Sequence, residues 1–293
     1  MNKALTLTVI FKAGSLNYGE GIGNISELKK IHRSNGDVLS FASRQSIRYD
    51  IVRLGNELFN WNLDTVHKKG TVQFKPEISI KDSVEMDFFG YLMTDKKSKK
   101  RAAVARLSHA ISMEPYNSDL EFLNNMGLAE RIGETPNLAN IEQHESFYTY
   151  TLTLDLSQVG KDEDVEITNK DKAERVNQLL DILKILNRNI RGRQESLAPL
   201  FIIGGLYPIS NPFFLGGLEL EKGKDWSLKT GLLEDVLNIT FGGVSVKSNT
   251  CIGLKRDIFK NESDIKQLVD KSSDVESFFS DLQEAINKFY EVA

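Results

Sequence analysis

Residues 4–11 read ALTLTVIF, and the prediction of the fold starts from this stretch. Leu5, Leu7, Val9 and Phe11 occupy alternate positions, with threonines between them. A period of two is typical of a β-strand with one buried face, because successive side chains point to opposite sides. We therefore expect a half-buried strand here, followed by a glycine-rich loop at residues 13–24.

Two amphipathic helices are predicted downstream of this strand. Residues 39–55, LSFASRQSIRYDIVRLG, begin the first helix, and residues 172–190, KAERVNQLLDILKILNRNI, form the second. In both stretches apolar residues recur every three or four positions, which places them on one helix face. They are Ile47, Ile51, Leu54 and Leu58 in the first helix, and Val176, Leu179, Leu180, Leu183 and Leu186 in the second.

Further strands complete a recognisable order. SFYTYTLTLDLSQV at residues 146–159 alternates β-branched and aromatic residues, and LAPLFIIGGLYP at 197–208 is typical of a buried strand. The resulting order is strand, helix, one or more strands, helix, strand. This is the βαββαβ pattern of ferredoxin-like α+β folds. Residues 60–143 look like an insertion, in which Asp87–Tyr91 is predicted as a strand, and 261–293 as one or two helices.

Composition limits the function classes. The 293 residues are 40% hydrophobic and 27% charged, values typical of a soluble globular protein of one large or two ordinary domains. No apolar run is long enough to cross a membrane, and neither a secretory signal nor a disulfide framework is evident, so we expect a cytoplasmic protein without membrane contact. The four histidines are scattered, GEGIGN at 19–24 does not complete a phosphate-loop motif, and G-x-S-x-G does not occur. We therefore predict no metal and no nucleotide cofactor, while a Ser-His-Asp arrangement stays open from the sequence alone.

The charge is unevenly distributed. The net charge is −4, but residues 261–293 alone carry eight acids and three lysines, a net −5. Basic clusters remain at residues 27–53, at KKSKKR (96–101) and at NRNIRGR (187–193). Because the local field rather than the total charge attracts a phosphate backbone, nucleic acid stays a candidate partner.

The start of the first predicted helix is the strongest candidate site. Ser43, Arg44, Gln45 and Arg48 fill its first two turns, where acids are normally favoured. The arginines could cover the core or pair with nearby aspartates at 37 and 50. Four donors that suit phosphate oxygens, at a helix end that attracts anions, instead favour a phosphate clamp.

Other candidates have structural alternatives. KKSKKR could be a solvated loop or a phosphate contact, and Arg188 suits a helix C-terminus, whereas Arg191 and Arg193 lie beyond that helix. In YPISNPFFLGG, residues 207–217, two prolines rule out a central strand. Phe213 and Phe214 are therefore expected in a loop, either buried on a neighbouring surface or exposed to stack on bases.

Several of these stretches resemble a known family. TLTVIF, SLNYGEGIGNISELKKI, SFASRQSIRYDI, DFFGYLM and SHAISMEPYNSD are similar to the DevR-like CRISPR-associated backbone subunits of type I-B Cascade. The resemblance spans most of residues 1–220. It implies a hand-shaped subunit with an RNA-recognition-like palm (1–59 and 144–293), a finger insertion (60–143), a thumb loop (about 204–218) and an acidic helical tail (about 261–293).

The resemblance also implies a non-catalytic function. Such subunits oligomerise head to tail along guide RNA (crRNA), hold its backbone, and present it for pairing with target DNA. The implied partners are the large subunit, the end-capping subunit and the repeat-processing endonuclease of the complex. The implied RNA-binding residues are Lys29, Lys30, Ser43, Arg44, Gln45, Arg48, Ser108, His109, Arg191, Arg193, Tyr207, Phe213 and Phe214.

Two alternatives stay open from the sequence. One is an RNA endonuclease of the same broad class, for which His32 is the histidine to test. The other is a small-molecule enzyme that binds a phosphorylated ligand through the glycine-rich loop.

Overall fold

A computed structural model describes residues 3–94, 98–163, 165–223 and 225–292, so Lys96 and Lys97 of the basic run lie outside the described residues. A central sheet organises the chain, with strands in the order β22-β21-β18-β1-β13-β10-β4-β3 and β9 beside β13. Their bounds are β1 Ala4–Gly14, β3 Lys30–His32, β4 Val38–Ala42, β9 Ala105–Leu107, β10 Ala110–Ser112, β13 Glu145–Asp155, β18 Phe201–Tyr207, β21 Cys251–Leu254 and β22 Lys271–Ser273.

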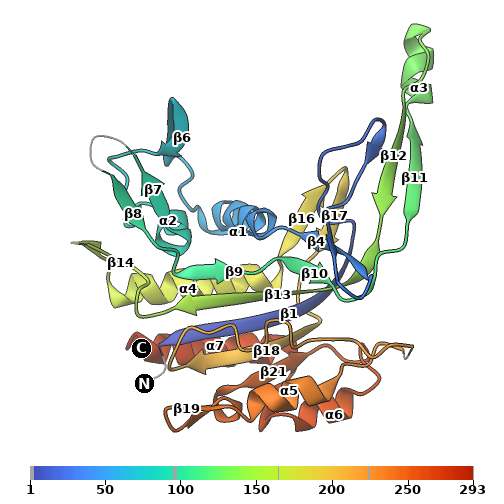
Figure 1. Cartoon of the computed structure of the whole chain (residues 1–293). Helices are drawn as coiled ribbons and strands as arrows, with labels where there is room; N and C mark the ends of the chain where they lie inside the picture. The colour runs from blue at the N-terminus through green and yellow to red at the C-terminus, as the bar shows by residue number, and fades with distance from the viewer. Residues whose placement is uncertain (1–2, 95–97, 164, 224, 293) are drawn as a thin grey trace.

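The predicted βαββαβ order is confirmed, and the fold is α+β. The core strands lie in the order β18-β1-β13-β10, and each is antiparallel to its neighbour. Helix α1 (Arg44–Phe59) connects the first half of this core and α4 (Asn169–Lys184) the second. Figure 1 shows both helices on one side of the sheet.

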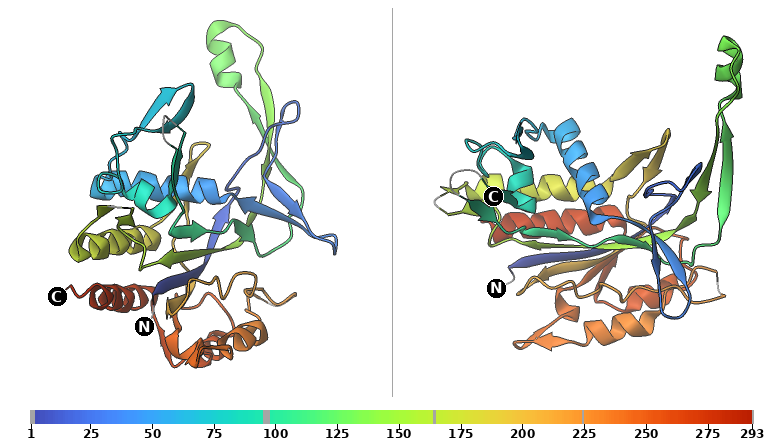
Figure 2. Two further views of the ribbon diagram at one scale, coloured as in Figure 1. Left: turned by 60° about the vertical axis from the view of Figure 1, so that its left-hand side comes forward. Right: turned by 45° about the horizontal axis from the view of Figure 1, so that its top comes forward.

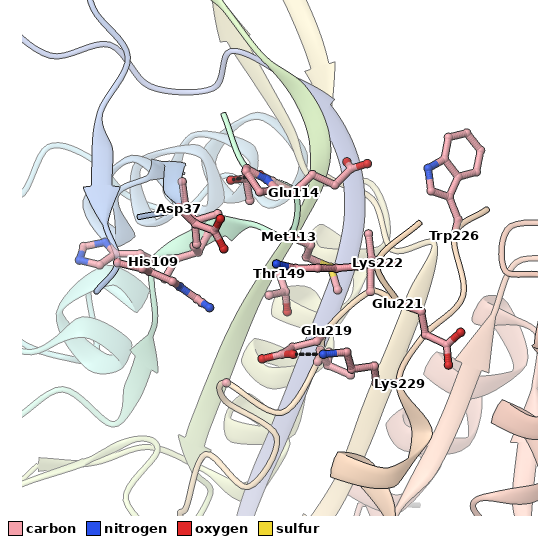
Figure 3. A pocket seen from close by; sticks show the side chains of 18 of the residues that line it. Asp37, His109, Met113, Glu114, Thr149, Glu219, Glu221, Lys222, Trp226 and Lys229 are labelled. Carbon is pink, nitrogen blue, oxygen red and sulfur yellow. Dashed lines mark hydrogen bonds and ion pairs between the residues drawn. The ribbon is translucent and has the colours of Figure 1, made fainter. Parts of the chain in front are cut away.

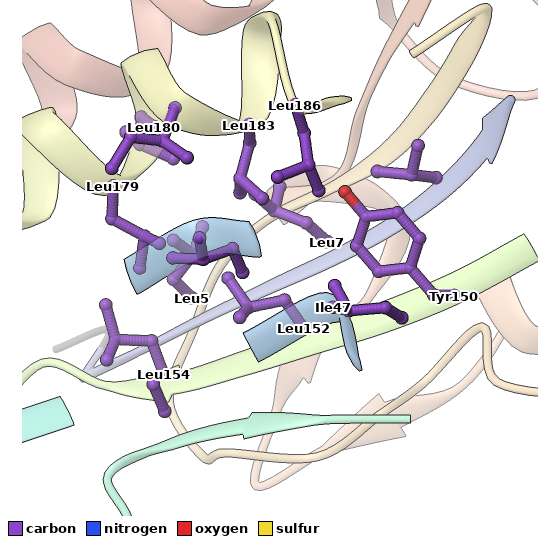
Figure 4. Packing of buried hydrophobic residues seen from close by; sticks show 14 of the residues in the cluster. Leu5, Leu7, Ile47, Tyr150, Leu152, Leu154, Leu179, Leu180, Leu183 and Leu186 are labelled. Carbon is purple, nitrogen blue, oxygen red and sulfur yellow. The ribbon is translucent and has the colours of Figure 1, made fainter. Parts of the chain in front are cut away.

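The first face of the sheet packs against these helices. Leu7 lies opposite Leu152 in the β1–β13 register, and both side chains are fully buried. Leu179 and Leu183 of α4 pack onto the same cluster, together with Ile47 of α1 (Figure 4). Each such side chain contributes about 1.5–3 kcal/mol through burial. The apolar period of the sequence therefore predicts this layer correctly.

The second face of β1 is also buried, so the prediction of a half-buried strand is wrong. Thr6 and Thr8 are 0% and 1% exposed. Their hydroxyls are satisfied internally: Thr6 donates to the carbonyl of Asn211 at 2.8 Å, and Thr8 bonds Thr151 across the strands at 2.8 Å. A second layer, which includes α5 (Thr230–Leu237) and α6 (Glu262–Gln267), lies on this side (Figure 1). Threonines tolerate this burial because their hydroxyls have partners.

The acidic C-terminal segment is integral to the fold. Strand β22 extends the sheet in parallel with β21, and α7 (Val275–Phe289) packs beside α4. Phe279 and Ile286 of α7 are fully buried. Its acids line the outward faces of helices whose apolar faces complete the core, as amphipathic patterning requires.

The predicted insertion at 60–143 is divided in two, because β9 and β10 inside it are strands of the central sheet. The part before β9 is called the finger module here (60–104), and the hairpin after β10 the arm (119–143). Figures 1 and 2 show them as projections on either side of α1. The finger module contains β5 Val66–Lys69, β6 Thr71–Phe74, α2 Val84–Phe89, β7 Tyr91–Met93 and β8 Lys99–Arg101, and the arm contains β11 Asp119–Asn124, α3 Met126–Ala129, the 3-10 turn Glu130–Ile132 and β12 Leu138–Gln143.

Short pairings complete the described structure. They are β2 Ile25–Ser26, which joins β12 in parallel, β14 Lys161–Asp162 with β15 Val165–Glu166, β16 Asn187–Ile190 with β17 Arg193–Ser196, β19 Thr240–Phe241 with β20 Val244–Ser245, and the 3-10 turn Lys247–Asn249. Within the described ranges, no helix has the length and apolarity that a membrane span requires.

A buried ionic cluster joins the finger module to α4. Asp87 is fully buried and lies in α2, so the predicted strand at Asp87–Tyr91 is wrong at its start. Its two carboxylate oxygens accept from Arg101 and Arg175, each at 2.8 Å. The backbone N–H of Gly160 donates to the same carboxylate at 2.9 Å. The Asp87 carboxylate thus connects α2 to β8 through Arg101, to α4 through Arg175, and to the turn at Gly160.

Gly55 should not accept a side chain, although it lies inside α1. The ring of Trp61 packs over it, and an added Cβ would come within 2.2 Å of that ring. Gly55→Ala should therefore lower the melting temperature, although alanine normally favours a helix by about 1 kcal/mol. The matched control is Gly231→Ala in α5, where an added Cβ meets open space, so stability should be unchanged or slightly higher. Differential scanning calorimetry of both variants tests this, and a more stable Gly55→Ala protein would contradict it.

Candidate nucleic-acid interface

Ser43 defines the start of α1. Its side chain accepts from the N–H of Ser46 at 3.2 Å, which makes it the N-cap. Its own N–H donates to Oδ1 of Asn17 in the loop after β1, at 3.0 Å. The first turn of α1 contains no acid. The positive end of the helix is therefore left without an internal carboxylate, and the Ser43 hydroxyl serves the helix itself.

Arg44 and His109 form the next part of the surface. The backbone N–H of Arg44 donates to Nδ1 of His109 at 3.0 Å, so this nitrogen is unprotonated. The histidine ring rests on Phe41, with ring centroids 5.1 Å apart. Burial, followed by the positive charges of Arg44 and Lys29, lowers the pKa of His109. The lowered pKa favours the neutral form of His109, which is the form that accepts the hydrogen bond from the start of α1.

The Arg44 side chain is exposed and has no ion-pair partner among the described residues. The same holds for the half-buried Lys29, while Gln45 is exposed beside them. Tyr49 follows one helical turn after Gln45 and is 65% exposed. The sequence analysis missed Tyr49, although its place on the polar face of the amphipathic helix was a usable signal. These groups combine cations, an amide and an aromatic ring on one surface.

Two of the predicted clamp residues are engaged within the chain. Arg48 bonds Glu85 at 2.6 Å and lies over the ring of Phe89, 4.9 Å from its centroid. Lys30 forms an ion pair with Glu142 at 2.6 Å and lies 4.9 Å from the ring centroid of Tyr116. These contacts connect α1 to the finger module and β3 to the arm. Neither cation is free for an external phosphate in this structure.

The basic segment after α4 forms the hairpin β16–β17. Because α4 ends at Lys184, Arg188 lies in β16, and the expectation that it lies at a helix C-terminus is wrong. Arg188 forms an ion pair with Asp50 at 2.7 Å, and burial raises the pKa of Asp50 despite this partner. At the tip, Arg191 is exposed in the left-handed conformation (φ 47°) and lies 4.4 Å from the ring centroid of Tyr18. Arg193 is half-exposed, 3.7 Å from Glu195.

The Ser108 hydroxyl and the aromatic rings of residues 207–214 are engaged within the chain. The Ser108 hydroxyl donates to the carbonyl of His109 and accepts from the N–H of Thr151. Tyr207 is 1% exposed, bonds Thr250 at 2.7 Å, and burial raises its pKa. Phe214 is fully buried, and the half-buried Phe213 packs 4.8 Å from the Tyr207 ring. The buried alternative is thus the correct one, and 204–218 offers no exposed aromatic tip for bases.

The arm is the projecting hairpin that the sequence analysis missed as a unit. All six residues of β11 are exposed, and the arm rises from the body beside β10 (Figure 1). Its tip presents Met126, Leu128 and Ile132, which are 50%, 59% and 75% exposed. Two six-residue stretches flanking a segment that contains Gly127, Gly133 and Pro136 were the available signal. Exposed apolar groups at such a tip are typical of contact with another molecule.

A groove of about 1340 Å³ begins at Arg44 and His109. It runs over the second face of the sheet, across Thr149 and Met113, to the loop that carries Trp226 (Figure 3). Glu219 and Lys229 form an ion pair at 2.7 Å within it. No cluster of His, Cys, Asp and Glu that could hold a metal occurs in the described part of the chain. The groove is neither fully enclosed nor flat, and both charged and apolar side chains line it.

The fold places this chain among ferredoxin-like α+β proteins with long insertions between core elements. The family model described as "CRISPR-associated negative auto-regulator DevR/Csa2" matches residues 5–214. The chain therefore belongs to the DevR/Csa2 family, as the sequence resemblance predicted. A search of curated proteins returned no match.

Two solved structures share the fold. A chain of a "CRISPR RNA-guided surveillance complex, pre-nicking" is 10% identical, with a TM-score of 0.65, over 97% of this chain and 100% of that one. A chain of a "CRISPR RNA-guided surveillance complex" is 12% identical, with a TM-score of 0.58, over 96% of this chain and 99% of that one. At these identities the similarity establishes the fold alone.

Proposed function

We propose that this chain is a non-catalytic backbone subunit that binds guide RNA in a type I-B interference complex. The observation that carries the proposal is the surface at the start of α1, where Arg44, Lys29 and Gln45 face outward without an internal carboxylate partner among the described residues. Cations, amide donors and a helix N-terminus bind phosphate oxygens without reading bases. A subunit that binds guides of different sequences must bind the RNA backbone independently of the base sequence.

The neighbouring elements suit the same role. The cationic tip of the β16–β17 hairpin, at Arg191, offers a further phosphate contact, and Tyr49 offers a face on which a base can stack. We assign the thumb to the arm rather than to 204–218, with the apolar tip at Met126, Leu128 and Ile132 displacing a base. In this assignment the central sheet with α1 and α4 is the palm, and residues 60–104 are the fingers.

The proposed partners follow from the family. Copies of the chain would stack head to tail along the RNA, leaving the guide free to pair with target DNA, and would meet the large subunit, the end-capping subunit and the processing endonuclease. A head-to-tail interface that does not close produces a helical filament. The site of action would be the cytoplasm.

Co-expression with a CRISPR array tests the function. The purified chain should carry RNA of uniform length, and its affinity for single-stranded RNA should be independent of sequence and fall steeply with salt. Protein that purifies free of nucleic acid and binds no RNA at low salt would contradict the proposal.

The endonuclease alternative makes a different prediction. His32 is exposed on β3. Cleavage of labelled repeat RNA by the wild-type chain, abolished in His32→Ala, would establish that alternative. Unchanged RNA after prolonged incubation supports the non-catalytic function. Binding of a phosphorylated small molecule at the glycine-rich loop, measured by calorimetry, would support the metabolic enzyme.

A further inference from the structure

Trp226 lines the groove in an unusual backbone conformation (Figure 3). Its φ is 39°, in the left-handed region that bulky side chains rarely adopt. The residue is 46% exposed, whereas the other tryptophan of the chain, Trp61, is 3% exposed. Burial in the core therefore does not explain why a large aromatic ring occupies this position. Strained residues cluster where a side chain is held ready for a ligand, so Trp226 is a candidate binding residue.

The loop that carries Trp226 is anchored to the body. Leu220 and Leu228 form an isolated β-bridge at its base, and Leu228 is fully buried. The side chain of Asn261 bonds both backbone groups of Leu228: Oδ1 accepts from the N–H at 3.1 Å, and Nδ2 donates to the carbonyl at 2.8 Å. The strained conformation is thus maintained by bonds on its flanks, as such conformations require.

The indole ring is also held in position. It meets the ring of Phe147 in a T-shaped contact, with ring centroids 5.3 Å apart. The ammonium of Lys12 lies 5.2 Å from the indole centroid and is itself paired with Glu145 at 2.6 Å. A ring that is oriented before binding loses little conformational entropy when a flat ligand stacks on it.

The rest of the groove favours an anionic ligand. Three of its cations have no carboxylate partner among the described residues, namely Arg33, Arg44 and Lys222. Of its five acids, three already bond donors of the chain itself, namely Asp37, Glu114 and Glu219. The volume of about 1340 Å³ exceeds the roughly 300–1,000 Å³ of typical small-molecule sites, which favours a chain of nucleotides over a single one.

We propose that Trp226 stacks on a base of the RNA whose backbone is bound at Arg44, and that the groove is the path between the two contacts. This inference rests on the proposed function for the identity of the ligand. Single-stranded RNA supplies both a phosphate for the arginine and a flat base for the indole. Trp226 lies outside residues 5–214, which the family model matches, so the sequence resemblance does not imply this contact.

Tryptophan emission tests the proposal on the full chain, because a stacked base quenches an indole. Oligouridine RNA should quench the emission, and an abasic oligonucleotide of the same length should not. Trp226→Ala should remove the RNA-dependent quenching and weaken affinity by about five- to 150-fold, the effect of one stacked base. The salt dependence of binding should not change, because stacking neutralises no phosphate. Arg44→Ala should shift the quenching to higher RNA concentrations, since one strand occupies both contacts.

Three further variants keep the test sharp. Trp226→Phe should retain most of the affinity, because it keeps an aromatic face. Phe241→Ala is the matched control, since this aromatic residue is 52% exposed in the same C-terminal layer but does not line the groove, and its loss should leave RNA affinity unchanged. Trp226→Gly replaces Trp226→Ala if the latter fails to fold, because glycine adopts the left-handed conformation without strain.

Four outcomes would overturn the inference. A folded Trp226→Ala protein with wild-type RNA affinity, or equal quenching by the abasic oligonucleotide or by uridine monophosphate, would refute stacking and leave RNA binding at Arg44 standing. Emission that falls with rising protein concentration in the absence of RNA would instead place a second copy against Trp226. If fluorescence anisotropy shows that the wild type binds no RNA at low salt, the proposed function and this inference both fall.

Discussion

Arg44→Ala should weaken the binding of single-stranded RNA by about ten- to hundredfold per copy, because a hydrogen bond to a charged group contributes about 1.5–3 kcal/mol. The loss should be the same for all RNA sequences. The slope of log affinity against log salt should fall by about 0.7, the value for one phosphate contact on a single strand. Fluorescence anisotropy across a salt series measures both quantities.

Arg48→Ala is the matched control, since Arg48 lies four residues further along the same helix. Its guanidinium is already engaged by Glu85 and Phe89, so its removal should change RNA affinity less than twofold and lower the melting temperature instead. Arg44→Lys should retain most of the salt slope, because it keeps the charge and loses only the planar fork. Equal losses of affinity in Arg44→Ala and Arg48→Ala would contradict the assignment of the phosphate contact to Arg44.

Asp87→Asn should destabilise the protein by about 3–5 kcal/mol. The substitution keeps the shape of the side chain but leaves Arg101 and Arg175, whose side chains are 6% and 12% exposed, without their carboxylate. An uncompensated buried charge costs about this much. Because whole domains are stable by only about 5–15 kcal/mol, the effect would dominate the unfolding curve. Urea denaturation followed by circular dichroism measures it.

The control for Asp87→Asn is Glu57→Gln, which removes the half-exposed partner of Arg53. A pair of this kind contributes about 0–1 kcal/mol. Limited proteolysis adds a local readout, since the loss of Asp87 should expose residues 60–104 to cleavage before the rest of the chain. A midpoint shift no larger than that of Glu57→Gln would show that the cluster does not anchor the finger module.

The elements with long, regular patterns were predictable from the sequence. The alternation in 4–11 and the apolar period in 172–184 each continue over enough residues to specify the element, although the alternation did not show that the threonine face of β1 is buried as well. Strands β9 and β10 were missed because each contains only three residues, too few to show a period. Their place in the sheet depends on pairing with β13, which is a long-range contact that no local pattern encodes.

The candidate site was predictable only in part, for a related reason. The sequence places Arg44 and Arg48 on one helix with the same charge, but it does not show that Glu85 lies beside one of them and no carboxylate beside the other. Phe213 and Phe214 likewise look like a loop tip until the second layer covers Phe214. Whether a polar or aromatic residue is available to a ligand depends on its neighbours in space.

The loop after β1 is bonded to both functional parts of the molecule. Asn17 accepts from the N–H of Ser43 at the start of α1, while the N–H of Leu28 donates to Glu142 at the root of the arm, at 2.7 Å. A neighbour that holds the arm in place therefore also holds the segment that positions Arg44, and RNA bound at Arg44 holds the arm in place in turn. Thermodynamic linkage makes the effect mutual. Copies arriving next to an occupied site should consequently bind more tightly than the first, so that RNA fills in unbroken runs.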